Sequence, residues 1–265
     1  MNARPKTWHY GLVARHWAEH ITDGPEIAYF QKQIERNGQP ALDAGCGTGR
    51  LLIPFLQAGL DVDGCDLSPD MLALCRERAE REGLRPRLYQ QALHELDLPR
   101  TYQTIVVCGA FGIGVSRQQD CIALQRFHAH LNPGGLLLLD DHLPYGDAKE
   151  WQLWRKELRN QLPESWHDTV GKTPPDDGSG YELHSRIAAF DPLEQCITRQ
   201  MRTVLWCDGQ LIAEEEYTLY ENLYFRNELR QILEQAGFEI EAIQGDYTEA
   251  EATAEHEIIV FFARK

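Results

Sequence analysis

Apolar side chains recur along this chain at two spacings, and the switch between them predicts the order of its elements. Residues 7–37 place apolar side chains three or four positions apart, which predicts a helix that Asp23-Gly24-Pro25 breaks in two. From residue 41 onward, short apolar runs alternate with amphipathic stretches, which is typical of strands alternating with helices. We expect strands beginning at Ala41 and at 61–66, 85–89, 104–108 and 136–140. The pattern predicts a doubly wound α/β sheet.

The second half of the chain changes character. A helical stretch at 151–162 and a Gly/Pro-rich loop at 172–180 are followed by strand-like runs at 181–190, 196–207 and 210–220. Asp191-Pro192 and Asp208-Gly209 provide turns between these runs, which predicts an antiparallel meander. A helix at 226–235 and strands at 239–245 and 256–264 are expected to close the chain.

Composition narrows the class of protein. The 265 residues are 43% hydrophobic, no run approaches 18 apolar residues, and the formal net charge is −15. An acidic surface repels phosphate backbones, so we expect no nucleic acid partner and no membrane span. The seven cysteines are scattered without a C-x-x-C pair, which favours reduced thiols, a cytoplasmic location and no metal site.

The stretch from Ala41 to Arg50 carries the candidate chemistry. An apolar strand runs through Asp43 into glycines 45, 47 and 49, which allow positive φ and a close approach of ligand to backbone. A dinucleotide fingerprint would need a third glycine where Arg50 stands. A P-loop would need Lys-Ser/Thr where Arg50-Leu51 stands. What remains is Asp-x-Gly-x-Gly-x-Gly.

This pattern resembles motif I of the class I S-adenosylmethionine (SAM) dependent methyltransferases. Two further stretches strengthen the resemblance: Asp66-Leu67-Ser68-Pro69-Asp70-Met71-Leu72, and Leu131-Asn132-Pro133-Gly134-Gly135 before an apolar strand. The resemblance implies a Rossmann-like, seven-stranded, mostly parallel sheet, with SAM as cofactor and S-adenosylhomocysteine (SAH) as product. It also divides the chain into an N-terminal helical lid (1–40), a SAM-binding domain (41–141 and 225–265), and an inserted antiparallel subdomain for substrate (142–224).

Asp66 is the strongest single candidate for a cofactor contact. It ends the second strand 23 residues after Asp43, near the offset at which an acid meets ribose hydroxyls. An acid at a strand end is often a helix cap, but Ser68 already provides that cap. We therefore expect Asp66 to accept hydrogen bonds from the ribose.

The remaining cofactor contacts are carried over from the resemblance. Gln91 stands where the family usually has an aspartate that accepts from the adenine amino group, and a glutamine oxygen can accept in its place. Gln103 is a second departure, where the family usually has Phe-Asp. The full set of expected cofactor residues is Asp43, Gly45, Gly47, Asp66, Leu67, Met71, Gln91, Ala92, Leu93, Cys108 and Phe111, with Tyr10 and Arg15 as lid contacts.

The reaction implied is methyl transfer to nitrogen or oxygen of a small-molecule acceptor by in-line displacement. A base is needed only if the acceptor loses a proton, and His142 and Tyr145, just past the fifth strand, are the candidates, with Asp141 beside them. Two alternatives stay open: a methyltransferase acting on RNA or protein, and a catalytically silent SAM-binding protein, which the altered Gln91 and Gln103 allow. We expect a monomer or homodimer.

Overall fold

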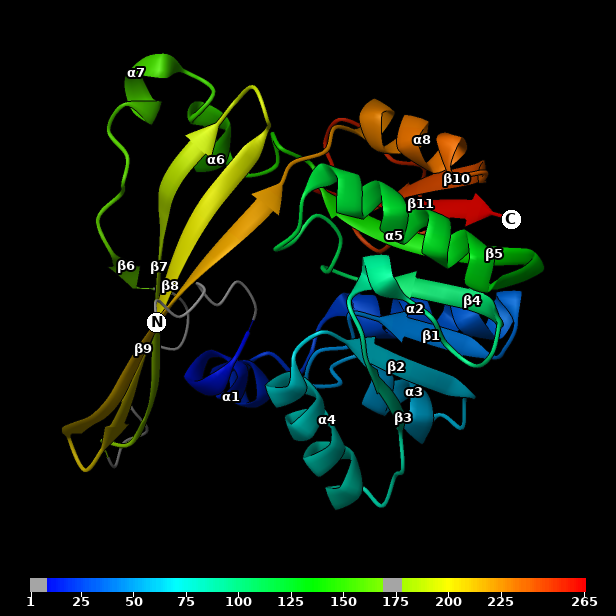
Figure 1. Cartoon of the computed structure of the whole chain (residues 1–265), viewed down its shortest axis with the longest axis horizontal. Coiled ribbons are helices and arrows are strands. Elements are labelled where there is room, and N and C mark those ends of the chain that lie inside the picture. Colours follow the sequence, from blue (N-terminus) through cyan, green and yellow to red (C-terminus); the bar gives the residue numbers. More distant parts are fainter. Residues whose placement is uncertain (1–8, 169–177) are drawn as a thin grey trace.

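The computed structural model describes residues 9–168 and 178–265, which build two sheets (Figure 1). The larger sheet has the order β10-β11-β5-β4-β1-β2-β3. Its pairs are parallel, except that β11 runs antiparallel to both β5 and β10. The strands are β1 (Ala41–Ala44), β2 (Val62–Asp66), β3 (Arg87–Gln90), β4 (Tyr102–Val107), β5 (Leu131–His142), β10 (Glu239–Gly245) and β11 (Ile258–Arg264). The predicted seven-stranded, mostly parallel sheet is confirmed.

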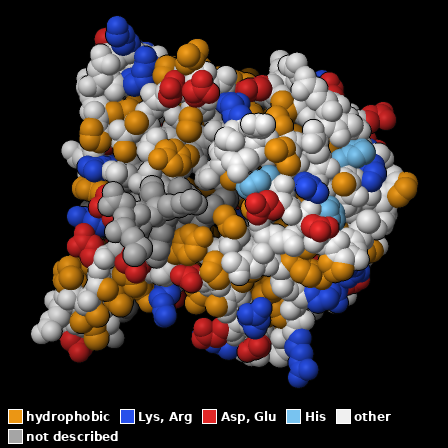
Figure 2. All heavy atoms as spheres, in the orientation of Figure 1, with side chains coloured by type: hydrophobic (Ala, Val, Ile, Leu, Met, Phe, Trp, Pro, Cys, Tyr) orange, Lys and Arg blue, Asp and Glu red, His pale blue; other side chains and the backbone are white. Residues whose placement is uncertain are grey.

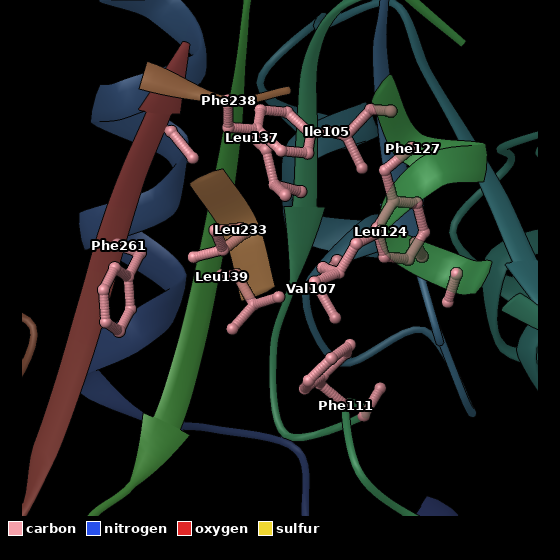
Figure 3. Packing of buried hydrophobic residues seen from close by; sticks show 14 of the residues in the cluster. Ile105, Val107, Phe111, Leu124, Phe127, Leu137, Leu139, Leu233, Phe238 and Phe261 are labelled. Atoms are coloured by element: carbon pink, nitrogen blue, oxygen red, sulfur yellow. The ribbon is translucent and has the colours of Figure 1, made fainter. Parts of the chain in front are cut away.

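Helices cover both faces of this sheet because alternate strand residues point to opposite sides. Leu137 and Leu139 of β5 join one core with α5 (Arg117–His130) and α8 (Arg226–Gln235), and Figure 3 shows them beside Leu124, Phe127 and Leu233. Leu136 and Leu138 join the other core with α2 (Pro25–Asn37), α3 (Leu52–Gln57) and α4 (Pro69–Arg81). The strands are apolar almost throughout because both faces are buried.

Local signals set the ends of these helices. The Ser68 hydroxyl accepts a hydrogen bond from the Met71 N–H at 3.2 Å, and Pro69 is the first residue of α4. Ser116 and Gln119 form a capping box at the start of α5. The predicted break at Asp23-Gly24-Pro25 separates α1 (Gly11–His20) from α2.

The smaller sheet has the order β6-β7-β8-β9 and is antiparallel. Its strands are β6 (His167–Asp168), β7 (Gly180–Asp191), β8 (Cys196–Cys207) and β9 (Gln210–Asn222), and we call β7 to β9 the meander. Asp208 and Gly209 both have positive φ, as a tight hairpin turn requires. The predicted inserted meander is confirmed.

Two expectations in the connection to the meander differ from the structure. The helix predicted at 151–162 is instead two short ones, α6 (Ala148–Gln152) and α7 (Lys156–Arg159), because Arg155 adopts an extended conformation that interrupts the run. The two-residue β6 was not predicted. The loop predicted at 172–180 lies largely outside the described residues.

Helix α1 lies between the two sheets. The Gly11 N–H donates to Asp70 Oδ2 of α4 at 2.6 Å, and the Leu12 N–H donates to Glu215 Oε2 of β9 at 2.7 Å. Val13 packs in a small apolar cluster with Leu183, Met201 and Tyr217 of the meander. Two carboxylates, one from helix α4 and one from strand β9, therefore accept from the first N–H groups of α1.

The surface is mixed in charge. Acidic and basic side chains are interspersed on the face that Figure 2 shows. Among the helices of the described segments, none is both long and apolar enough to cross a membrane.

Candidate functional site

A cavity of about 360 Å³ extends from the glycine turn after β1 to the meander. Its loop end is lined by Asp43, Gly45, Gly47, Asp66 and Gln91. Its meander end is lined by His9, Trp17, Asp120, Met201 and Glu221. Both ends belong to one continuous space, whose volume lies in the range of small-molecule sites.

The glycine turn shapes the loop end. Gly45, Gly47 and Gly49 all have positive φ, at 85°, 52° and 84°. A Cβ atom at Gly45 would overlap the Cβ of Ala110, and one at Gly49 would lie 2.7 Å from Cys75 Sγ. A Cβ at Gly47 would meet nothing within 4 Å, so this backbone borders open space. The turn thus leaves room for a ligand to lie against its main chain.

Asp66 lies beside this turn with part of its carboxylate in use. Its Oδ1 accepts from the Ser68 N–H at 2.8 Å, and its Oδ2 accepts from the Gly47 N–H at 2.9 Å. A carboxylate offers about four acceptor positions, so about two remain for a ligand. Burial raises the pKa of Asp66. The side chain can still accept hydrogen bonds from a diol, as the sequence predicts.

Asp43 is a second buried acid at the loop end, and its Oδ2 has no hydrogen-bond partner in the described chain. Burial and the nearby charge of Asp66 raise the pKa of Asp43 to about 7. Arg50 also lines the cavity but forms an ion pair with Glu26 of α2. Two buried carboxylates, one with an oxygen that lacks a hydrogen-bond partner, favour a cationic ligand. These two acids fit the positive charge of SAM.

The meander end holds two further carboxylates. Asp120 Oδ2 accepts from Asn222 Nδ2 at 2.8 Å and from the Tyr224 hydroxyl at 2.7 Å. Glu221 accepts from both Nε and Nη2 of Arg199, at 2.6 and 2.9 Å. Arg199 also reaches Glu150 of α6 at 2.6 Å. Burial raises the pKa of Asp120. Acidic side chains therefore line both ends of the cavity.

His9 lies where the two ends meet. Its carbonyl accepts from the Ser68 hydroxyl at 2.7 Å, and its ring stacks on Trp17 with centroids 4.7 Å apart. Burial lowers the pKa of His9 to about 4, although the charge of Glu221 acts in the opposite direction. The imidazole is therefore uncharged at neutral pH.

Most of the residues expected to bind the cofactor line the cavity, but three of them lie elsewhere in the described structure. Arg15 is exposed, Phe111 packs on Tyr224 at a centroid distance of 5.4 Å, and Tyr10 is absent from the lining. Gln91 lines the cavity with its amide engaged: Nε2 donates to the Asp97 carbonyl and Oε1 accepts from the Asp97 N–H. The expected residues that line the cavity are Asp43, Gly45, Gly47, Asp66, Leu67, Met71, Gln91, Ala92, Leu93 and Cys108.

The two candidate bases lie apart from the lining. His142 is exposed at the end of β5, and Tyr145 is 38% exposed with its ring edge toward Trp151. Asp141 is turned into the protein, where its Oδ2 has no hydrogen-bond partner among the described residues. The catalytic role of His142 and Tyr145 stays a prediction.

Several lining residues escaped the sequence reasoning, namely His9, Trp17, His94, Asp120, Met201 and Glu221. They come from the start of the chain, the loop after β3, the first turn of α5, and the meander. No fixed spacing joins these segments, so only the folded structure brings them together. The one available signal was the reasoning that placed substrate binding in the inserted segment.

Comparisons with known proteins agree with this geometry. A family model described as a methyltransferase domain matches residues 41–135. The provisionally named methyltransferase GWCH70_2453 of Geobacillus sp. (strain WCH70) is 24% identical over 248 residues, which are 90% of this chain and 91% of that protein. Two solved structures share the fold at 18% identity. A SAM-dependent methyltransferase from Clostridium acetobutylicum ATCC 824 has a TM-score of 0.73 over 95% of this chain and 96% of its own. The sugar N-methyltransferase KedS8 from Streptoalloteichus sp. ATCC 53650 has a TM-score of 0.69 over the full length of both chains.

Proposed function

We propose that this chain, a class I SAM-dependent methyltransferase, methylates an amino nitrogen of a small-molecule acceptor held at the meander end of the cavity. One observation carries the proposal: a single space of about 360 Å³ joins the glycine turn to the meander. Donor and acceptor would therefore share one pocket, as direct transfer between them requires. An amine lone pair would form the new N–C bond to the methyl group that bound SAM supplies, the C–S electron pair would go to sulfur so that SAH leaves, and the methylated nitrogen would release its extra proton to solvent.

The loop end provides the groups that would hold the cofactor. The remaining acceptor positions of Asp66 suit the ribose hydroxyls, and the backbone at Gly45 and Gly47 suits the amino-acid part. The carboxylate of Asp43 offsets positive charge there. We further propose that α1 serves as a lid and that the meander selects the acceptor, because α1 is bonded to both α4 and β9.

The preference for nitrogen rests on charge. The Glu221 carboxylate at the meander end attracts amines, which are cationic at neutral pH, and repels carboxylates and phosphates. KedS8, whose fold matches this chain over its full length, is a sugar N-methyltransferase. Both points support a small, basic acceptor.

Calorimetry with SAM, followed by a screen of amines for SAH release, tests this function. We expect SAM to bind the wild-type protein and Asp66→Ala to abolish binding, while Glu239→Ala, an exposed acid on β10, leaves it unchanged. Turnover of amines but not of matched alcohols supports nitrogen as the acceptor atom. Absence of SAM binding, or turnover of alcohols alone, would refute the proposal.

A further inference from the structure

We propose that His9 and Glu221 form the subsite for the amino group of the acceptor, with His9 accepting a hydrogen bond from the nitrogen and Glu221 attracting its cationic form. This inference rests on the proposed function and assigns its acceptor subsite to two residues. Both line the same cavity, one from the start of the chain and one from β9. The subsite therefore selects aliphatic amines over neutral or acidic acceptors.

The placement of His9 suits contact with a reacting nitrogen. Its backbone is held by the Ser68 hydroxyl, two residues from Asp66, and its ring is held by Trp17. In the described part of the chain, no hydrogen bond to either ring nitrogen is found, and His9 is one of the residues that line the cavity. A fixed imidazole with an available nitrogen is a ready acceptor for a ligand N–H.

The protonation state of His9 fits the same role. An uncharged imidazole has one nitrogen that accepts a hydrogen bond, whereas an imidazolium has none. Because burial keeps the His9 pKa near 4, the ring is an acceptor at neutral pH. The ammonium form that Glu221 attracts must first release one proton to solvent. The neutral amine then donates a remaining N–H to this ring, and its lone pair is free for the methyl group.

Glu221 supplies charge in a fixed geometry. The Arg199 guanidinium donates hydrogen bonds to both carboxylate oxygens of Glu221 and to one oxygen of Glu150. One cation is therefore shared between two acids. Of the two acids, Glu221 lines the cavity. The two hydrogen bonds from Arg199 also hold Glu221 in one rotamer. Its side chain therefore loses little conformational entropy when a ligand binds.

Asp120 is the competing candidate for the same role. Its Oδ2 already accepts two hydrogen bonds, and burial raises its pKa, which favours the neutral form. Glu221 instead forms a two-point ion pair with the guanidinium of Arg199 and lines the cavity. Glu221 is therefore the better electrostatic partner for an ammonium group, and Asp120 is a structural acceptor for Asn222 and Tyr224.

The test compares four variants with the wild type, using cyclohexylamine, ethanolamine and an amino sugar as acceptors and SAH release as readout. His9→Phe keeps a ring to stack on Trp17 but removes the acceptor nitrogen, and we expect kcat/KM to fall about 100-fold. His9→Gln restores an acceptor oxygen and should recover most of that loss. Glu221→Gln should raise the KM for amines about tenfold with a smaller change in kcat. His20→Phe, which changes an exposed histidine at the end of α1 that does not line the cavity, should match the wild type.

Parallel calorimetry with SAM separates the outcomes. Unchanged SAM affinity in His9→Phe, together with the loss of turnover, supports the subsite. Unchanged turnover in both His9→Phe and Glu221→Gln overturns it while leaving amine methylation intact. A loss of SAM affinity that matches the loss of turnover assigns His9 to the cofactor and also overturns it. If the wild type binds SAM but methylates none of these amines, the proposed function itself fails.

Discussion

We expect Asp43 to make the affinity for SAM depend on pH near neutrality. Its pKa of about 7 means that the ligand-free side chain is largely neutral below pH 7 and ionised above it. A cationic ligand prefers the ionised form, so we expect SAM affinity to fall as the pH drops through 7. Calorimetry between pH 5.5 and 8.5 measures this dependence of SAM affinity on pH. Asp43→Asn should bind SAM more weakly than the wild type, with an affinity that no longer changes over this pH range. A slope that persists in Asp43→Asn would contradict this origin.

The same group affects stability. The folded-state pKa of Asp43 lies above its ordinary value of 3.8, so ionisation opposes folding. The contribution of Asp43 is therefore most favourable below about pH 4, declines as the pH rises to about 7, and is constant above that. We expect the gain in thermal midpoint of ligand-free Asp43→Asn over the wild type to grow between pH 4 and 7. A gain that shrinks over this range would contradict the assignment.

Two glycines of the turn form a matched pair. Both have positive φ, but only at Gly45 would a Cβ overlap a neighbour, namely Ala110. Gly47→Ala should lower the free energy of unfolding by about 1 kcal/mol through backbone strain alone. Gly45→Ala should cost about 1–3 kcal/mol more because of overpacking. Urea denaturation of both variants checks this order, and equal costs would argue against the clash.

At the scale of residues, the sequence predicts the loop end well and the meander end poorly. Asp43, Gly45, Gly47 and Asp66 lie within one strand-turn-helix unit and the next strand, so their spacing is informative. His9 and Glu221 are more than 200 positions apart, and nothing near either residue marks it as a partner of the other. The side chain of Gln91 illustrates the limit: its bonds to Asp97 depend on a loop path that residue type does not reveal.

At the scale of elements, α1 depends on acids that it does not contain. It has no acidic residue in its first turn and no side-chain N-cap, and Asp70 and Glu215 accept from its first N–H groups instead. Glu215→Ala should destabilise α1 locally by about 1 kcal/mol, as loss of a helix cap does. Amide hydrogen exchange over residues 11–20 should accelerate. Glu216→Ala, the exposed neighbour on β9, should leave it unchanged, and equal acceleration in both would contradict the capping role.

Element boundaries followed from the sequence where the signals are local. Ser68-Pro69, Ser116 and Asp208-Gly209 each act within a few residues, so α4, α5 and the β8–β9 hairpin begin or turn as expected. The stretch 148–159 was less predictable because its helical pattern is interrupted only by the backbone conformation at Arg155. The two-residue strand β6 forms because it pairs with β7. This contact is distant in sequence, so no local pattern predicts it.

For the whole molecule, Arg117 ties the larger sheet to the meander. From the first turn of α5 it donates to the carbonyls of Glu194 and Leu223, pairs with Glu228, and lies 4.4 Å from the Tyr224 ring centroid. A lysine ammonium cannot make all of these contacts at once, because it lacks the planar, several-armed guanidinium. Arg117→Lys should therefore lower the free energy of unfolding by about 1–3 kcal/mol. Urea denaturation measures the loss. Arg126→Lys, exposed on the same helix, should change little, and a similar loss there would refute the argument.

The α1 helix has a consequence for how such an enzyme acquires new acceptors. The first turn of α1 is bonded to α4 through Asp70 and to β9 through Glu215. A change at either the cofactor end or the acceptor end of the cavity would therefore affect α1. If the meander holds the acceptor, as proposed, substitutions within it would remodel the acceptor site and leave the glycine turn unchanged. Substitutions in the first turn of α1 would alter both together. Changes of acceptor specificity, in evolution or by engineering, should therefore accumulate in residues 180–222, where they would leave cofactor binding intact. Residues 11–20 should tolerate fewer changes.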